Sequence, residues 1–177
     1  LVHREIGAAT HRGGGPALIA LFALAAYISV KAVFHQQALG AIDAHLYDGA
    51  PAVRVAAFPR SLKLLGWSTF VETEGYYQIS SIDFLDSAPF DPTAGRRYYK
   101  PRPGPALESA WNSETGRDYA RFAQFAYTQI DSDPEGSVVR LTDFRFRTDS
   151  SAGFLCKITL DNGHRVVGEY LGFSGRE

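Results

Sequence analysis

The sequence predicts an α+β protein, in which an amino-terminal membrane helix is followed by a mainly antiparallel β domain with one or two packed helices. Three observations predict this class: an uncharged apolar run from Gly13 to Val30, short segments in which apolar and polar side chains alternate, and two helical patterns between them. The expected organisation is a loop over residues 1–15, a transmembrane helix over 16–36, a juxtamembrane helix over 37–50 and a soluble mainly-β domain over 51–177.

The apolar run is long enough to cross a bilayer. As an α-helix, residues 16–34 would extend about 28 Å, close to the roughly 30 Å hydrocarbon core. Lys31 lies near the far end, where its ammonium group can reach the headgroups. A buried helix of a soluble protein and a signal peptide are the alternatives, but the residues before the run do not follow the usual order of a signal peptide. We therefore expect the lipid bilayer to be a partner of this chain.

The composition excludes several classes of function. The formal net charge is -1, with 18 basic and 19 acidic side chains, so we expect no nucleic-acid partner. The single cysteine, Cys156, rules out an internal disulfide framework and a multi-cysteine zinc site. The sequence has no methionine and begins at Leu1, so we expect a fragment of a longer protein.

The middle of the chain alternates between strand and turn signals. We predict strands over residues 53–58, 67–73 and 76–82, the last two joined by a turn at Glu74-Gly75. Residues 83–105 are rich in Asp, Pro, Gly and basic side chains, which predicts a long surface connection. A first short helix is expected from Ala106 to Trp111.

Ser113 can cap a second helix, which we expect to continue to about Thr128. Its apolar stripe should pack on the sheet and consists of Tyr119, Phe122, Ala123 and Ala126. Three closing strands are predicted over residues 138–147, 154–160 and 164–173. The tripeptide Asp161-Asn162-Gly163 predicts a tight turn between the last two.

Asp143 and Arg145 are the candidate polar site of the chain. They stand two residues apart in the segment VVRLTDFRFR, so on a strand they would share a face with apolar neighbours. Two readings stay open. The pair either anchors a ligand or the membrane part, or joins a charge-paired structural network, because buried charges are normally paired.

No metal site or nucleophile is assigned to this chain. The residues weighed as metal ligands are His35, Asp43, His45, Asp48, Asp83, Asp86 and Asp91. His35 and His45 are nearly three helical turns apart, unlike the adjacent-turn pairs that bind zinc, and turn chemistry accounts for Asp83, Asp86 and Asp91. Cys156 lies on the apolar face of a predicted strand, which does not suit a nucleophile. A basic and aromatic patch over residues 96–102 either meets phosphate or lipid headgroups or is a solvated loop, and the near-neutral net charge of the chain favours the loop.

Several segments, in their order, resemble the carboxy-terminal part of the bacterial membrane-bound metal-dependent hydrolase family, also described as LexA-binding, inner membrane-associated hydrolases. After a last membrane helix they read VAAFPRSLKLLGW, VETEGYYQIS, YYKP, RFAQFAY and VVRLTDFRF. In that family, His and Asp motifs in the amino-terminal half are taken as the metal site. His11-Arg12-Gly13 echoes one of them only superficially, so no metal ligand is carried over.

The resemblance implies the carboxy-terminal fragment of a metal-dependent hydrolase of the bacterial inner (plasma) membrane. Its catalytic divalent metal, if present, would lie in an upstream half, and the resemblance gives no substrate. The alternative is a single-pass, membrane-anchored binding or interaction domain without catalysis, which would use the 83–105 connection and the Asp143/Arg145 face to hold a protein partner or lipid.

Overall fold

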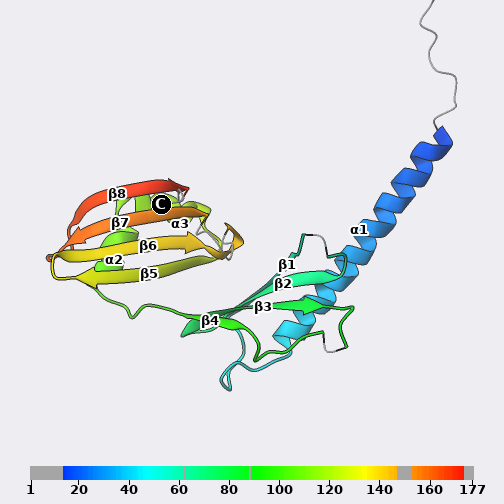
Figure 1. Ribbon diagram of the computed structural model, residues 1–177, viewed down its shortest axis with the longest axis horizontal. Helices are drawn as coiled ribbons and strands as arrows, with labels where there is room; N and C mark the ends of the chain where they lie inside the picture. The colour runs from blue at the N-terminus through cyan, green and yellow to red at the C-terminus, as the bar shows by residue number, and fades with distance from the viewer. Residues whose placement is uncertain (1–13, 62, 88, 147–152, 174–177) are drawn as a thin grey trace, which may run out of the picture. The chain divides into compact units, whose positions relative to one another are not determined.

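The computed structural model describes residues 14–61, 63–87, 89–146 and 153–173, so the predicted loop before residue 14 and the His11-Arg12-Gly13 echo lie outside the described residues. The chain divides into two compact units, Leu1–Tyr98 (unit 1) and Tyr99–Glu177 (unit 2). In each unit, helix precedes a four-stranded antiparallel sheet whose strands follow one another in chain order (Figure 1). The α+β class is confirmed.

Unit 1 consists of one long helix and a meander. Its elements are α1 (Gly14–Asp43), β1 (Arg54–Pro59), β2 (Gly66–Glu72), β3 (Tyr76–Asp83) and β4 (Arg96–Tyr99). The sheet order is β1-β2-β3-β4. In the register of the first hairpin Pro59 lies opposite Trp67, and in the second Gly66 lies opposite Asp83.

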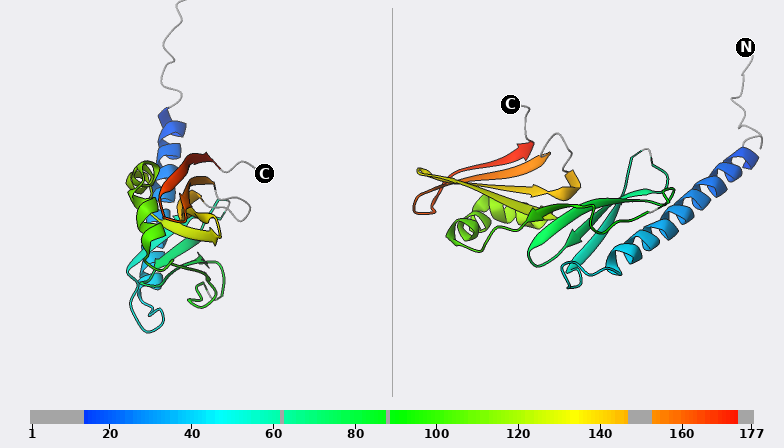
Figure 2. Two further views of the ribbon diagram at one scale, coloured as in Figure 1. Left: turned by 90° about the vertical axis from the view of Figure 1, so that its left-hand side faces the viewer. Right: turned by 60° about the horizontal axis from the view of Figure 1, so that its bottom comes forward.

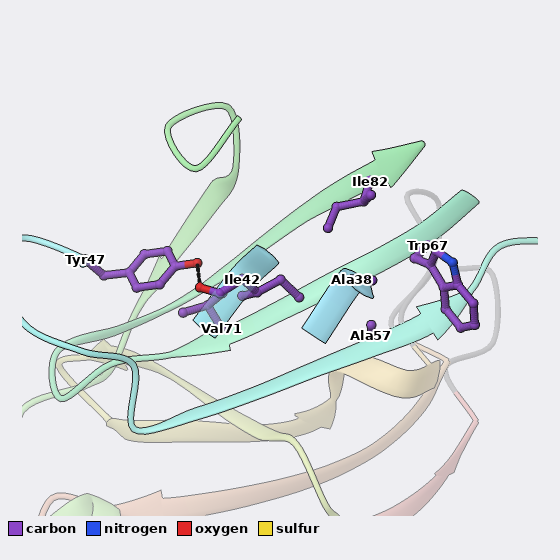
Figure 3. Packing of buried hydrophobic residues seen from close by; sticks show 7 residues of the cluster. All are labelled: Ala38, Ile42, Tyr47, Ala57, Trp67, Val71 and Ile82. Atoms are coloured by element: carbon purple, nitrogen blue, oxygen red, sulfur yellow. Dashed lines mark hydrogen bonds between the residues drawn. The ribbon is translucent and has the colours of Figure 1, made fainter. Parts of the chain in front are cut away.

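The core of unit 1 lies between the second half of α1 and the sheet. Ala38 and Ile42 stand four residues apart, on one face of the helix, and both are fully buried. Figure 3 shows them facing Ala57 of β1, Val71 of β2 and other core side chains. The remaining members of the cluster are Tyr47, Trp67 and Ile82. Packing on β1 and β2 therefore fixes the second half of α1.

The helix α1 ends at Asp43, seven residues before the predicted end of the juxtamembrane helix at residue 50. Tyr47 and Ala50 form an antiparallel bridge around Asp48 and Gly49, whose φ angles are 53° and 85°. An Asp-Gly pair favours such a left-handed turn. The Tyr47 hydroxyl donates a 3.0 Å hydrogen bond to the Ile42 carbonyl, which satisfies one of the last acceptors of the helix.

Unit 2 has two short helices and a second meander. Its elements are α2 (Pro105–Asn112), α3 (Glu114–Phe122), β5 (Ala126–Asp133), β6 (Gly136–Asp143), a 3-10 turn η1 (Phe144–Phe146), β7 (Phe154–Asp161) and β8 (Val166–Phe173). The sheet order is β5-β6-β7-β8. Both helices lie on one face of this sheet (Figure 2), where α2 contacts β6 and β7 and α3 contacts β7 and β8.

The helices of unit 2 begin as the sequence predicts. Ser113 caps α3, and its hydroxyl accepts a 3.0 Å hydrogen bond from the Gly116 amide. Gly116 also allows close packing, because a Cβ atom there would lie 2.0 Å from the Ala110 carbonyl oxygen. The core beneath the helices consists of Ala110, Tyr119, Val139, Leu141, Cys156, Ile158 and Leu160.

The structure corrects the predicted second helix. That helix was expected to reach Thr128, but α3 ends at Phe122 and β5 begins at Ala126. The Asp143 carboxylate accepts hydrogen bonds from the amides of Gln124 and Phe125, at 2.9 and 3.4 Å. Those amides would otherwise bond to carbonyls of the preceding helical turn, so a residue far along the chain ends the helix.

Two further segments differ from their predicted secondary structure. Part of the expected 83–105 connection forms the short strand β4, and the strand expected over 138–147 ends at Asp143 and is followed by η1. The turn at Glu74-Gly75 is confirmed. The turn at Asp161-Asn162-Gly163 is also confirmed, where the Asp161 carboxylate accepts from the amides of Gly163 and Arg165 at 2.8 and 2.9 Å.

Candidate functional sites

The first half of α1 is the most unusual surface of the described chain. Every residue from Gly15 to Val30 is exposed, and burial begins only at Lys31. The exposed large apolar side chains of this segment are Leu18, Ile19, Leu21, Phe22, Leu24, Tyr27, Ile28 and Val30. Gly15–Asp43 is the only helix among the described residues with the length and hydropathy of a membrane span. A signal sequence would meet the same two criteria.

Aromatic and basic side chains surround the point where α1 joins its sheet. The Lys31 ammonium group donates a 2.8 Å hydrogen bond to the Leu64 carbonyl and lies 4.7 Å from the centre of the Trp67 ring. The His35 ring lies 5.0 Å from the same indole, and its Nε2 is 3.1 Å from the Ala57 carbonyl oxygen. Lys31 therefore links the end of the exposed helix to the loop between β1 and β2.

The structure does not bring the two weighed histidines together. His35 contacts Trp67, whereas the His45 ring stacks on Phe90 with 5.3 Å between ring centres. Asp48 instead forms a 3.2 Å ion pair with Arg97. Within residues 14–61, 63–87, 89–146 and 153–173, no group of three or more His, Cys, Asp or Glu side chains could hold a metal ion.

Two acidic residues of the 83–105 segment, Asp83 and Asp91, have hydrogen-bond partners. Asp83 accepts a 2.5 Å hydrogen bond from the Lys63 ammonium group and a 3.2 Å bond from the Leu85 amide. The bond from Lys63 is the main reason that the pKa of Asp83 is lowered. Asp91 accepts from the amide and the hydroxyl of Thr93, both at 2.7 Å. These are the contacts of an ion pair and of an Asx-turn.

Asp143 is a fully buried carboxylate at the end of β6. Arg145 donates to it from its backbone amide at 2.9 Å and from its guanidinium group at 2.8 Å. The two residues do not share a strand face as predicted, because Arg145 lies in η1 and folds back onto the carboxylate. The Arg145 guanidinium also bonds to the Phe122 carbonyl, at 3.1 Å.

The network around Asp143 favours the charged carboxylate. Burial by itself raises the pKa of Asp143, but the hydrogen bonds from Arg145 and from the amides of Gln124 and Phe125 outweigh it, so the net shift is downward. The carboxylate thereby ties the end of α3 and the start of β5 to the end of β6. This geometry is that of a structural, charge-paired network, and a ligand-anchoring role for the pair stays a hypothesis.

Two other predicted features also take part in the fold. Arg97, within the basic and aromatic patch, lies on β4, places its guanidinium 4.5 Å from the centre of the Tyr76 ring and donates to the Gln78 side chain at 3.3 Å. Cys156 is fully buried, and burial with the nearby charge of Glu169 raises its pKa to about 12. A thiol with this pKa stays protonated at neutral pH, so Cys156 is a core residue.

Sequence reasoning overlooked the basic side chains that gather beside Lys31. Arg60 and Lys63 come from the loop between β1 and β2, about thirty residues further along the chain, and line a common pocket with Lys31. In the sequence, only the short spacing of Arg60 and Lys63, followed directly by the apolar Leu64, could have drawn attention to them.

The comparisons with known proteins concern unit 2. One protein family, described as the YfhP C-terminal alpha/beta plait domain, has a model that matches residues 105–177. The match begins at the first residue of α2 and lies within unit 2. No curated protein and no solved structure matches the chain. The description of the matching family names neither metal-dependent hydrolysis nor LexA binding.

Proposed function

We propose that this chain is the membrane-anchored, non-catalytic carboxy-terminal part of a bacterial inner-membrane protein, a metal-dependent hydrolase of the LexA-binding group that its segments resemble. The observation that carries the proposal is the exposed apolar half of α1. From Gly15 to Val30 this helix rises about 24 Å. In water such a surface is strongly unfavourable, whereas a bilayer would cover it.

Because α1 is a single unbroken helix, the proposed anchor would be rigidly connected to unit 1. One helix without a break leads from the exposed apolar segment into the buried face formed by Ala38 and Ile42. Unit 1 would therefore be held in a fixed orientation at the membrane surface instead of hanging from a flexible linker. An accessory unit fixed in this way could position whatever it contacts relative to the membrane part of the protein.

Two observations favour the accessory role over catalysis within the chain. The chemically versatile side chains that were weighed, among them Asp143, Cys156 and His35, are occupied by structural contacts. The family that matches residues 105–177 is described as a C-terminal domain. In its relatives the corresponding segment is therefore a terminal part of the protein, as the resemblance to the hydrolase family also implies.

A single-pass, membrane-anchored binding domain is the second candidate, and β8 favours it. This strand is an edge of the unit 2 sheet and exposes Val167, Tyr170 and Phe173. An exposed apolar edge strand offers unpaired backbone groups to another chain. A protein partner could add a strand there, with no catalytic half required.

Metal analysis separates the two candidates. We would purify the 177-residue chain and the product of its complete reading frame, and measure bound divalent metal and phosphoester or peptide hydrolysis for both. The proposal predicts metal and activity only in the complete protein. Stoichiometric metal in the 177-residue chain that is lost on His35→Ala and His45→Ala would contradict it. Absence of metal and activity from both proteins would favour the binding domain.

A further inference from the structure

A basic pocket lies where the exposed part of α1 meets unit 1. Its volume is about 450 Å³, and it is open to solvent. It is lined by Tyr27 and Lys31 of α1 and by Pro59, Arg60, Ser61, Lys63 and Leu64 at the end of β1 and in the loop that follows. Three of these side chains are cationic, and the only carboxylate bonded to one of them among the described residues is Asp83. The pocket therefore has a net positive charge.

Donor groups remain available in this pocket. An ammonium group has three N–H donors; one of Lys31 bonds to the Leu64 carbonyl and one of Lys63 to Asp83. The exposed Arg60 guanidinium donates no hydrogen bond to a described side chain or carbonyl, although its charge helps to lower the pKa of Asp83. A planar guanidinium beside two ammonium groups suits the oxygens of a phosphate.

The position of the pocket favours the phosphate of a lipid headgroup over free phosphate. Tyr27 stands one helical turn from Lys31 on the side of the exposed apolar segment, and Leu24 follows another turn along it. Leu64, which is 56% exposed, adds an apolar side chain at the rim. Aromatic and basic residues typically gather at the level of the lipid headgroups, with apolar residues on the hydrocarbon side. A phosphate attached to acyl chains would meet both surfaces.

We propose that this pocket binds the phosphate of an anionic phospholipid headgroup, with the acyl chains lying along the exposed face of α1. The proposal rests on the membrane anchorage proposed above and adds a specific ligand class to it. Arg60, Lys63 and the free donors of Lys31 would hold the phosphate. Bound lipid would also fix the loop between β1 and β2 against α1, and so hold unit 1 at the membrane surface.

The reporter for the test is Trp67, whose ring lies 4.7 Å from the Lys31 ammonium group. The chain has two tryptophans, so Trp111→Phe leaves Trp67 as the single tryptophan, which can be excited selectively. We would titrate this detergent-solubilised full chain with dihexanoyl phosphatidylglycerol, dihexanoyl phosphatidylcholine and inorganic phosphate, and follow its fluorescence. We expect a saturable change with phosphatidylglycerol and at least fivefold weaker responses to the other two.

Arg60→Gln removes one charge from the pocket without removing a hydrogen bond to a described residue. We expect it to weaken phosphatidylglycerol binding about fivefold, the effect of one basic residue near an anionic surface. Arg117→Gln, an exposed residue of α3 outside the pocket, is the matched control and should bind as the parent does. If circular dichroism shows that Arg60→Gln is misfolded, Lys63→Gln replaces it.

Three results would overturn the pocket proposal: equal affinity for phosphatidylcholine, equal affinity for inorganic phosphate, or unchanged affinity in the pocket variants. Carbonate extraction of membranes keeps this failure distinct from that of the anchor. If the chain resists extraction but shows no preference for phosphatidylglycerol, the anchor stands and the pocket proposal fails. If carbonate releases the chain, the anchor fails and the lipid pocket fails with it.

Discussion

Units 1 and 2 have the same order of elements but use their helices differently. In both units helix precedes a four-stranded antiparallel meander and packs on one face of it. The two short helices of unit 2 fit the area of the sheet that they cover, and a serine cap begins the second. In unit 1, by contrast, the sixteen residues 15–30 of α1 are exposed and lie before the part of the helix that packs on the sheet. The excess length is not needed to cover the sheet, and we propose that it is the membrane anchor.

The two units also use polar groups differently. Unit 2 buries a carboxylate, Asp143, and satisfies it completely with Arg145 and two backbone amides. Unit 1 places three of its cations, Lys31, Arg60 and Lys63, at a surface pocket beside Trp67, with N–H donors left over. Polar groups that are fully paired inside a unit stabilise it, whereas cations left at a pocket are available to a ligand.

The largest effect is expected from breaking the carboxylate network. Asp143→Ala leaves Arg145 and the amides of Gln124 and Phe125 without their acceptor, which should cost about 3–5 kcal/mol. The two tryptophans report the units separately, because Trp67 lies in unit 1 and Trp111 in unit 2. In urea unfolding, the midpoint seen by Trp111 in a Trp67→Phe background should fall.

Asp143→Ala should leave the stability of unit 1 unchanged. The urea midpoint that Trp67 reports in a Trp111→Phe background should therefore be the same with and without this substitution. Asp143→Asn, which keeps one acceptor oxygen and the shape of the side chain, serves as the milder control. Equal midpoints for Asp143→Ala and the parent would mean that the network does not stabilise unit 2.

Membrane insertion should be nearly as sensitive to a charge in the first half of α1. Leu24→Lys places an ammonium group in the middle of the apolar segment, which costs about 2.5–3.5 kcal/mol on an insertion scale. We expect a large loss of the chain from the membrane fraction after carbonate extraction. Leu85→Lys, which alters an exposed leucine outside the helix and outside the pocket, is the control. Full retention of Leu24→Lys in the membrane would count against a spanning helix.

Substitution of one glycine in α1 and one in α3 should change the stability of the two units in opposite directions. Gly116→Ala in α3 would put a Cβ 2.0 Å from the Ala110 carbonyl oxygen and should destabilise unit 2 by about 1–3 kcal/mol. Gly40→Ala in α1 meets open space and should stabilise unit 1 by up to about 1 kcal/mol, because alanine is the better helix former. Thermal unfolding of both variants in detergent checks this pair. The same sign for both would show that the helices pack alike.

The smallest effect near neutrality is the pH dependence of unit 2. The pKa of Asp143 is lower in the folded chain than its ordinary value, so the folded state binds this proton less readily than the unfolded state. Its contribution is fully present above the unfolded pKa of about 4 and is lost as the pH falls through the lower folded pKa. The Trp111 midpoint should therefore decline below about pH 4, and this decline should be shallower in Asp143→Asn. If the parent and Asp143→Asn had identical pH profiles, groups other than Asp143 would cause the acid sensitivity.

The sequence predicts the features that are encoded locally. The apolar run of α1, the Ser113 cap and the Asp161-Asn162-Gly163 turn each depend on residues within one turn or one helix. Side-chain alternation likewise predicts β2, β3 and β7 within about two residues of their observed bounds. In these cases the side chains themselves supply the hydrogen bonds or the apolar face that defines the element.

Features that depend on a distant residue are not visible in the sequence. The end of α3 is set by Asp143, whose carboxylate takes the amides of Gln124 and Phe125. The strand β4 forms in a segment rich in turn residues because β3 offers it a partner. The basic pocket assembles from Lys31 and from Arg60 and Lys63, which no local pattern connects.

The central claim is that a lipid-covered helix runs without a break into the core of unit 1. Nitroxide scanning of single cysteines from Leu18 to Ala38, in a Cys156→Ala background and in reconstituted bilayers, tests it most directly. The account predicts that labels from residue 18 to about residue 30 are accessible to oxygen and shielded from a polar nickel reagent on every face of the helix, and that the label at Ala38 is shielded from both. Accessibility of residues 18–30 to the nickel reagent would contradict it.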